Sequence, residues 1–284
     1  MSKPGVIRVA TCQFAVTGRI KRNALQIRRQ MVQAKAQRAD LVHFSETALT
    51  GYAGTNFESW EGFDWATLRS ETERIMELAR AKKLWVVLGS THRLTGKHLP
   101  HNSLYIISPA GRIVDRYDKC FCTNGDLRFY SPGTHLPVFK VNGVTCGALI
   151  CYDLRFPELY RKYKRLGVEC LFQSFHNADS AGGPNVWTRI MRQTMQCRAA
   201  TNYFWVSANN SSAYYQSWPS VFIKPSGETA GQLKFHRAGV MVNTVDTSAE
   251  LYDASGAFRD RAMRGVLHTG RPVKDARSHA RTSL

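Results

Sequence analysis

The sequence contains no long apolar stretch. No window approaches the roughly 18 uninterrupted apolar residues that a membrane-spanning helix needs, so we expect no membrane partner. The N-terminus also lacks the hydrophobic run of a secretory signal, because a short charged start leads directly into alternating apolar and polar residues. The seven cysteines are an odd number without the spacing of a disulfide framework, which is typical of a reducing compartment. These absences predict a cytoplasmic protein.

A metal-binding pattern is missing as well. Cys120 and Cys122 stand close together, but no second close pair completes a set of four ligands, and His101 and His135 do not fall at a zinc spacing. We therefore expect no metal. Each cysteine is then either a small buried side chain or a nucleophile, and its position has to decide between the two.

Acidic residues are scarce. The chain has 21 Asp and Glu against 39 Lys and Arg, a formal net charge of +18, which raises the question of a nucleic-acid or anionic membrane partner. The basic residues are spread along the chain, however, without zinc-finger spacing or the aromatic run of an RNA-binding domain. The pattern favours a solvated basic surface, and nucleic-acid binding stays open as the alternative.

Short apolar runs alternate with amphipathic segments along most of the 284 residues. This alternation predicts a layered α/β domain over residues 1–258, followed by a basic C-terminal tail over residues 259–284. The expected strands cover residues 6–14, 41–45, 84–90, 103–108, 144–150, 170–174, 203–208, 220–223 and 240–245. The expected helices cover residues 21–38, 65–82, 156–165 and 186–200.

The most informative segment, residues 147–158, reads Gly-Ala-Leu-Ile-Cys-Tyr-Asp-Leu-Arg-Phe-Pro-Glu. It predicts a buried strand that ends in Cys151, a short turn, and a helix that starts near Pro157. A thiol at such a turn lies close to a helix N-terminus, whose dipole favours the thiolate, and to backbone N–H groups that are able to bind an oxyanion. From this pattern alone, a core cysteine that merely ends a strand is an equal alternative.

Two further segments supply the groups that a cysteine nucleophile needs. Glu46 directly follows a short apolar strand, at the edge where the carboxyl ends of parallel strands form a crevice. Lys119 lies in a segment between two expected strands. Attack on an amide requires a base for the thiol proton, a cation for the oxyanion and an acid for the leaving amine. Glu46, Lys119 and Cys151 are the residue types that provide this set.

In the order Glu46, Lys119, Cys151, these segments resemble the carbon–nitrogen hydrolase (nitrilase-like) superfamily. The sequence around Cys151 is similar to the nucleophile motif of its amidase branches. The supporting segments are Phe44-Ser-Glu46 with Thr50-Gly-Tyr52, Arg116-Tyr-Asp-Lys119 and Tyr130-Ser-Pro-Gly133. The resemblance implies a four-layer αββα sandwich and a homodimer or larger homo-oligomer, often formed through the helix after the nucleophile.

The resemblance also implies the roles of the site residues. Cys151 attacks the carbonyl or nitrile carbon, and Glu46 takes the thiol proton and delivers it to the departing nitrogen. Lys119 and the backbone N–H of Tyr152 stabilise the oxyanion. A thioester forms and is hydrolysed to a carboxylic acid, and no metal or organic cofactor is required. Many relatives carry a second glutamate where this chain has Asp126, which we expect to act as an auxiliary carboxylate if its shorter side chain reaches the lysine.

The sequence after Cys151 is similar to that of amidases for small linear carboxamides. Nitrilases usually carry a Trp-Glu pair there, which this chain lacks, and an N-carbamoyl amidohydrolase, which releases carbon dioxide as well as ammonia, is the main alternative. A catalytically weakened interaction protein that uses its basic surface is the alternative from another class. The candidate substrate-binding residues are Tyr52, Phe129, Arg155, His176 and Asn177.

Overall fold

The computed structural model describes residues 5–177 and 186–282 of the chain, and in them the strands form two six-stranded sheets. The order in sheet 1 is β12 (Gly239–Asp246), β1 (Val6–Gln13), β2 (Leu41–Phe44), β3 (Trp85–His92), β4 (His101–Ile107) and β5 (Ile113–Asp118). The order in sheet 2 is β11 (Thr229–Gln232), β10 (Val221–Ile223), β9 (Trp205–Asn209), β8 (Cys170–Ser174), β7 (Val144–Ile150) and β6 (Phe139–Val141).

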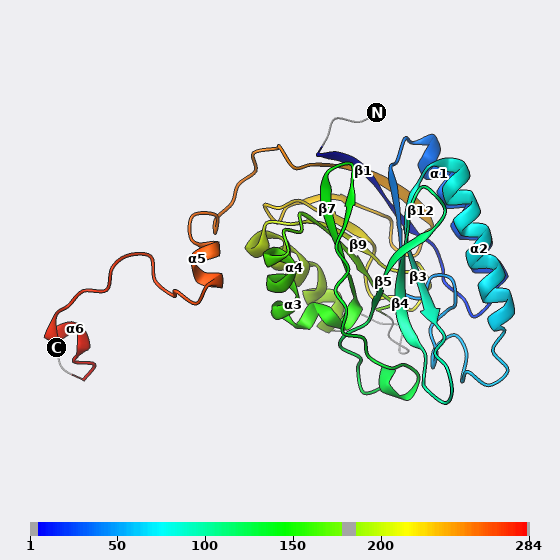
Figure 1. Ribbon diagram of the computed structural model, residues 1–284, viewed down its shortest axis with the longest axis horizontal. Helices are drawn as coiled ribbons and strands as arrows, with labels where there is room; N and C mark the ends of the chain where they lie inside the picture. Colours follow the sequence, from blue (N-terminus) through cyan, green and yellow to red (C-terminus); the bar gives the residue numbers. More distant parts are fainter. Residues whose placement is uncertain (1–4, 178–185, 283–284) are drawn as a thin grey trace.

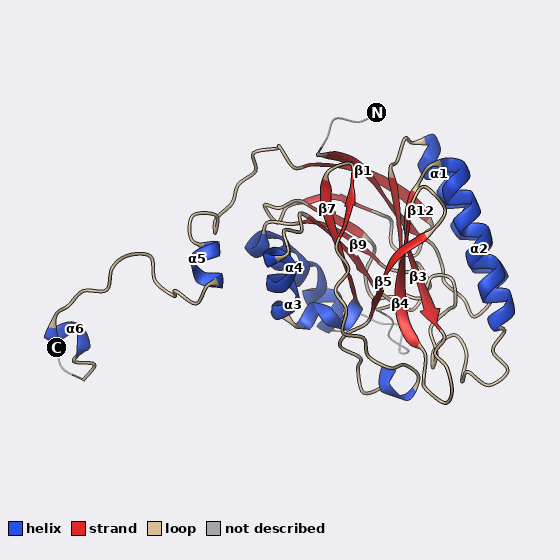
Figure 2. Ribbon diagram, in the orientation of Figure 1, coloured by secondary structure: helices blue, strands red, loops and turns tan. Residues whose placement is uncertain are grey.

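The two sheets pack face to face and helices cover both outer faces, as Figure 1 shows. On one side lie α1 (Ile20–Ala36) and α2 (Trp65–Lys82), and on the other lie α3 (Pro157–Arg165) and α4 (Val186–Asn202). Figure 2 shows the same layers by type of element. The arrangement is a four-layer αββα sandwich, so the predicted α/β class and layer order are confirmed.

The strand pattern explains why sheet 1 is covered on both faces. Successive side chains of a strand point to opposite faces. In β3, Val87 belongs to the core between the two sheets, whereas Val86 and Leu88 belong to the core beneath α1 and α2. A strand buried on both sides therefore appears in the sequence as a continuous apolar run.

The directions of the strands bring their carboxyl ends together. Strands β1, β2 and β3 are mutually parallel, and so are β7, β8 and β9. Strand β5 is antiparallel to β4, which is antiparallel to β3, so β5 runs in the direction of β2 and β3. The residues that follow β2 and β5 consequently lie at one edge of sheet 1, and those that follow β7 and β8 lie at one edge of sheet 2.

A fully buried histidine ties the two sheets together. His43 lies on β2, and its Nδ1 and Nε2 are each 2.8 Å from a serine hydroxyl of sheet 2, on Ser207 and Ser174 respectively. The Ser174 hydroxyl also donates to the carbonyl of Phe44 at 2.9 Å. Burial lowers the pKa of His43 to about 3, so its ring is neutral. This network fixes the strand before Glu46 against the strand before His176.

All nine predicted strands and all four predicted helices are present, with ends shifted by a few residues. Strands β5, β6 and β11 were missed because their sequences do not read as buried strands. β5 is Ile-Val-Asp-Arg-Tyr-Asp and carries four exposed or half-buried residues, β6 is three residues long, and β11 is mostly exposed.

The C-terminal segment leaves the sandwich. The short helices α5 (Arg259–Met263) and α6 (Ala276–His279) interrupt a chain that extends away from the body in Figure 1. Every residue from 264 to 282 is exposed. Within the described residues, no helix is both long and apolar enough to cross a membrane.

Candidate active site

Cys151 stands at a sharp turn between β7 and α3. Its φ of 43° lies in the left-handed region, which a residue with a side chain rarely adopts, so the backbone is strained at this position. A 3₁₀ turn over Cys151–Arg155 follows, and Pro157 begins α3. The turn takes Cys151 out of the strand direction, and the residue as a whole is half-buried. The predicted strand–turn–helix arrangement is confirmed.

The carboxylate of Asp153 accepts hydrogen bonds that hold this turn in place. Its Oδ2 accepts hydrogen bonds from the N–H of Ile150 at 3.0 Å and the hydroxyl of Tyr117 at 2.7 Å, and its Oδ1 accepts from the N–H of Phe121 at 2.9 Å. Burial raises the pKa of Asp153 to about 6, although these donors oppose the shift. The carboxylate thus links the Cys151 turn to the segment that follows Lys119.

Glu46 lies in the loop that follows β2, and a glycine on the neighbouring strand makes room for that loop. A Cβ atom on Gly89 would stand 1.8 Å from the carbonyl oxygen of Ser45 and 2.9 Å from the N of Thr47. Thr47 has a φ of 48°, so the backbone turns sharply directly after Glu46. The close approach to Gly89 therefore determines where the carboxylate of Glu46 lies.

Lys119 follows β5 and joins two carboxylates. Its Nζ is 3.0 Å from Glu46 Oε1 and 2.8 Å from Asp126 Oδ2. Glu46 also accepts from the side-chain amide of Asn102 at 2.7 Å and from the N–H of His176 at 2.7 Å. All three charged side chains are buried. Asp126 therefore reaches the lysine in spite of its shorter side chain.

The charges of this group act on one another and on the thiol. Burial raises the pKa of Cys151, and the carboxylate of Glu46 raises it further, whereas Lys119 and a hydrogen bond from the N–H of His176 oppose the shift. Burial also raises the pKa of Glu46, against the effect of Lys119. Burial works against the Lys119 ammonium, but Glu46 and the other acidic groups outweigh burial and raise the Lys119 pKa. The thiol and the ammonium thus both keep their protons at neutral pH.

Tyr52 and His176 cover the buried ion pairs. The hydroxyl of Tyr52 donates to Asp126, and its ring lies beneath Lys119, with Nζ 5.9 Å from the ring centroid. The imidazole of His176 stacks on the same ring at 4.7 Å between centroids. Both predicted substrate-binding residues therefore lie next to Glu46, Lys119 and Asp126.

The remaining predicted residues are held in different ways. Tyr152 follows Cys151 directly in the 3₁₀ turn. Arg155 ends the turn; burial lowers its pKa, and Tyr152 and Cys151 oppose the shift. The ring of Phe129 abuts Gly54. Asn177 supports the structure: its N–H donates to Asn210, its carbonyl accepts from Ser217 and its side-chain oxygen accepts from Trp218.

Three residues with evident structural roles at this site were not singled out from the sequence. Asn102 bonds Glu46 from β4, and nothing in its local sequence distinguishes it. Gln216 contacts His176 from a distant loop, and only the fold brings the two together. Asp153 is part of the nucleophile motif, so its place in that motif was an available signal.

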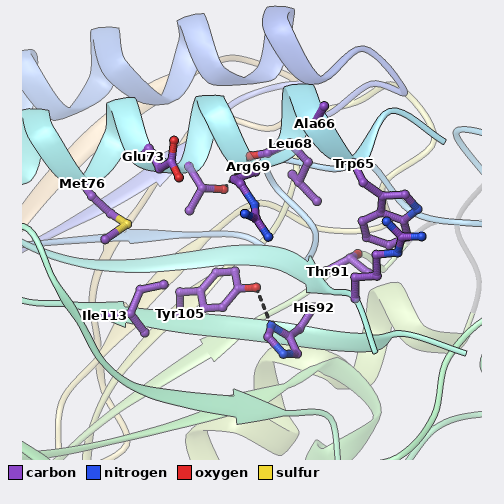
Figure 3. Close-up of a pocket in the computed structure, with 12 residues that line it drawn as sticks. Trp65, Ala66, Leu68, Arg69, Glu73, Met76, Thr91, His92, Tyr105 and Ile113 are labelled. Carbon is purple, nitrogen blue, oxygen red and sulfur yellow. Dashed lines mark hydrogen bonds between the residues drawn. The ribbon is translucent and has the colours of Figure 1, made fainter. Parts of the chain in front are cut away.

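The cavity shown in Figure 3 lies elsewhere. It has a volume of about 650 Å³ and is lined by α2 and by the strands of sheet 1, including Trp65, His92 and Tyr105. Glu46, Lys119 and Cys151 do not line it, so we assign the site by its chemistry and not by cavity size. Within residues 5–177 and 186–282, no three His, Cys, Asp or Glu side chains are arranged to hold a metal ion.

Known proteins share both the sequence pattern and the fold. A sequence model of the carbon-nitrogen hydrolase family matches residues 8–252. The chain is 30% identical over 220 residues to the "Hydrolase in agr operon" of Staphylococcus lugdunensis, which covers 74% of this chain and 88% of the relative. It is 29% identical over 145 residues to 2-oxoglutaramate amidase of Bacillus subtilis, which covers 50% of this chain and 54% of the relative.

Among solved structures, the fold is similar to that of an amidase from Nesterenkonia sp. The TM-score is 0.75 at 19% identity, and the match covers 94% of this chain and 98% of that chain. Another structure of that amidase shows acrylamide added at its active-site cysteine, and a cysteine-to-alanine variant of it has butyramide bound. At this identity the likeness concerns the fold, and it supports the four-layer sandwich.

Proposed function

Because this chain belongs to the carbon–nitrogen hydrolase family, we propose that it hydrolyses small linear carboxamides to a carboxylic acid and ammonia. As a member, it is an amidase-like enzyme of the nitrilase superfamily. The observation that carries the proposal is the position of Lys119 between two buried carboxylates, in a group whose charges act on the thiol of Cys151 at a strained turn. Cys151 is the nucleophile, Glu46 the proton carrier and Lys119 the electrostatic stabiliser.

The first half of the reaction forms a thioester. The raised pKa of Cys151 keeps the proton on the sulfur until substrate binds. As the sulfur attacks the carbonyl carbon, Glu46 accepts the thiol proton, and the C=O electrons move onto the oxygen. Lys119 and the N–H of Tyr152 stabilise this oxyanion. The intermediate collapses, the C–N bond breaks, and Glu46 gives its proton to the nitrogen, so that ammonia leaves.

The second half regenerates the thiol. Glu46, again a carboxylate, takes a proton from water, and the hydroxide attacks the thioester carbon. The same donors hold the second oxyanion, the C–S bond breaks, and Glu46 returns its proton to the sulfur. Every step uses one proton acceptor and one cation, both of which are buried in a site of low dielectric, where their effect is large.

Asp126 acts through Lys119. Burial favours its neutral form, but the ion pair with Lys119 outweighs burial, and the pKa of Asp126 is lowered. Asp126 is therefore an anion that holds the ammonium in place, while Tyr52 and the N–H of Thr123 hold Asp126. In this role it is a positioning residue, and the contact with Lys119 supports the auxiliary role proposed for its carboxylate.

The N-carbamoyl and nitrile reactions remain the alternatives for the same three residues. Both begin with attack of a thiol on an electrophilic carbon, so the triad does not separate them. The family's usual homodimer is also a proposal for this chain, through α3, which follows the nucleophile. A purely interacting role for the basic surface is disfavoured because Glu46, Lys119 and Cys151 form a complete set.

The decisive experiment is ammonia release from a panel of dicarboxylate monoamides, aliphatic amides, N-carbamoyl amino acids and nitriles, with carbon dioxide measured on every hit. We expect turnover of carboxamides without carbon dioxide. Cys151→Ala should abolish it, and Cys197→Ala, at an exposed cysteine on α4, is the matched control that should retain it.

Two results would overturn the proposal. Carbon dioxide released with the ammonia would move the chain to the N-carbamoyl class. No turnover anywhere, together with a Cys151 that fails to react with iodoacetamide, would exclude an active hydrolase.

A further inference from the structure

The main chain of His176 places this residue next to the reacting groups. Its N–H donates to Glu46 Oε2 at 2.7 Å, and the same N–H lowers the pKa of the Cys151 thiol against the effect of burial. The residue comes two positions after the end of β8, and the bond from Ser174 to Phe44 holds that strand against β2. The imidazole therefore starts from a fixed point beside the nucleophile.

The His176 ring is buried and neutral. Its residue is 7% exposed, and the ring stacks on Tyr52 at 4.7 Å with an angle of 18° between the planes. Burial lowers its pKa to about 3, and the charge of Lys119 adds to the shift. At neutral pH the ring carries one N–H donor and one nitrogen acceptor and no charge.

One of these two nitrogens faces a glutamine. Nε2 of His176 lies 3.5 Å from the side-chain nitrogen of Gln216, which is 3% exposed. Among the described residues, Nδ1 of His176 and Oε1 of Gln216 are both buried and have no hydrogen-bond partner. The hydroxyl of Ser217, the next residue, is also buried and has no hydrogen-bond partner among the described residues. The unpaired polar atoms thus belong to His176 and to two consecutive residues, Gln216 and Ser217, which contact His176 and Asn177.

The pattern of these unpaired atoms does not depend on how the amide is oriented. If the Gln216 nitrogen donates to the imidazole, then the ring leaves a free N–H donor and the amide leaves a free oxygen acceptor. If the amide is flipped, the ring leaves a free acceptor and the amide leaves a free donor. In both orientations the pair offers one donor and one acceptor.

We propose that His176 and Gln216 bind a second neutral amide or ureido group on the acyl part of the substrate, a group that both donates and accepts hydrogen bonds. The inference rests on the proposed amidase function and narrows its substrate class to diamides and ureido amides. An alkyl chain would leave the donor and the acceptor unpaired. A substrate carboxylate only accepts hydrogen bonds, so the acceptor atom of the pair would face an anion. The neutral imidazole of His176 would also provide no positive charge to stabilise that carboxylate.

The test compares three matched substrates at three chain lengths. Malonamide, succinamide and glutaramide carry the second amide; the acids malonamate, succinamate and glutaramate replace it by a carboxylate; and the corresponding amides with an isopropyl group replace it by an apolar isostere. For at least one length, we expect kcat/KM of the diamide, halved for its two equivalent amides, to exceed those of both analogues by about tenfold or more.

Two variants assign the preference to this pair. His176→Phe keeps a ring to stack on Tyr52 but removes both nitrogens, and Gln216→Leu removes the amide. Each should bring the ratio of diamide to isopropyl amide to within about twofold of unity, mainly through KM. His98→Phe, the same change at an exposed histidine, should leave the ratio as it is in the wild type.

The outcomes separate this inference from the proposed function. Turnover of isopropyl amides or monoamide acids at least equal to that of diamides would overturn the inference and leave the amidase function standing. A diamide preference that survives in both variants would do the same. No turnover of any amide would overturn the proposed function itself. If His176→Phe does not fold, judged by circular dichroism, Gln216→Leu decides alone.

Discussion

At the scale of single residues, the site depends on how closely Asp126 fits its surroundings. Its Oδ2 accepts from Lys119 at 2.8 Å and from the N–H of Thr123 at 2.9 Å, and its Oδ1 accepts from Tyr52. These contacts use the reach of an aspartate. The glutamate that many relatives carry would need a different backbone around it.

We therefore expect Asp126→Glu to lower activity and not to restore a better enzyme. The added methylene would push the carboxylate past Lys119 or displace Tyr52, and overpacking of this kind typically costs about 1–3 kcal/mol. The predicted result is a fall of about tenfold or more in kcat with a smaller change in KM, measured by ammonia release. Glu228→Asp, at an exposed carboxylate on the surface, is the matched control. A fully active Asp126→Glu enzyme would show that the site accommodates the longer carboxylate and that the reach of an aspartate is not required.

The residues that could be predicted from the sequence are those that lie within a local motif. Glu46, Lys119 and Cys151 each sit at the end of a strand in a recognisable segment, and the structure brings Glu46 and Lys119 into contact. Asn102 and Gln216 could not be predicted, because their roles arise from contacts with residues far away in the chain. Long-range contacts leave no periodic signal in a single sequence.

At the scale of elements, the loop after β2 is positioned by the strand beside it. Gly89 on β3 touches the backbone of Ser45, and its carbonyl accepts from the N–H of Leu49 at 2.9 Å. Gly89 thus contacts the loop that carries Glu46 both before the glutamate, at Ser45, and after it, at Leu49.

Gly89→Ala should displace this loop, because its new Cβ would stand 1.8 Å from the Ser45 carbonyl and backbone atoms cannot yield cheaply. We expect a loss of about 2–4 kcal/mol of unfolding free energy, as for other overpacked sites. We also expect kcat to fall at temperatures where the variant is still folded, because Glu46 is displaced. Gly62→Ala is the control, since no atom lies within 4 Å of the position and its φ of 65° adds only backbone strain. Equal kcat in the Gly89 variant and the wild type would contradict a role of Gly89 in positioning the Glu46 loop.

The buried His43 network predicts a specific pH dependence. The folded pKa of about 3 lies below the ordinary 6.5, so the unfolded chain takes up a proton that the folded chain refuses. Between these values, His43 alone lowers stability by up to about 1.4 kcal/mol per pH unit as the pH falls. Above pH 6.5 its two hydrogen bonds contribute fully.

His43→Leu should therefore be less stable than the wild type at pH 7.5 by about 1–3 kcal/mol, because it leaves hydroxyls of Ser174 and Ser207 without their histidine partner. The difference in stability between the two proteins should shrink on acidification. The wild type loses stability as His43 becomes protonated in its unfolded chain, whereas the variant has no histidine there. Urea unfolding at pH 7.5, 6 and 5 measures both effects, with the exposed His98→Leu as the control. A difference that is constant with pH would contradict a neutral buried His43.

Elements with a clear apolar pattern were predictable, and marginal ones were not. The central strands of both sheets are buried on two faces, which leaves continuous apolar runs such as Leu41–Phe44. Strands β5 and β11 lie at the edges of their sheets, where solvent replaces one or more neighbours and polar residues are tolerated. The sequence of an edge strand is therefore less constrained by burial.

At the scale of the whole molecule, charge and association are the open properties. Helix α4 carries no acidic residue and α3 carries Glu158 against four basic residues. Arg161 lies among Arg165, Arg198 and Arg259, and burial together with these like charges lowers its pKa. A homodimer through α3 would place such clusters opposite each other, so we expect association to strengthen with ionic strength, as sedimentation in low and high salt would show. Weaker association in high salt would point to a different face.

The division of the chain into a domain and a tail is also a proposal, and the contacts of Arg259 sharpen it. Its Nε donates to the carbonyl of Thr201 at the end of α4 at 3.0 Å, it pairs with Asp253, and its guanidinium lies over Tyr203. At the end of α5, Arg165 also donates to the carbonyl of Met263 at 2.6 Å. Helix α5 is therefore anchored to the sandwich, whereas the residues after it are exposed.

A chain that ends after Gly265 should unfold at nearly the same urea concentration as the full chain, since residues 266–282 are all exposed. A chain that ends after Phe258 should lose about 1–3 kcal/mol, because Asp253 stays half-buried without its arginine and the end of α4 loses a donor. Arg259→Ala in the full chain should reproduce most of that loss, while Arg271→Ala, at an exposed position, should not. This result would place the end of the domain after α5. Equal stability of the two truncated chains would place it at residue 258 instead, as the sequence pattern predicts.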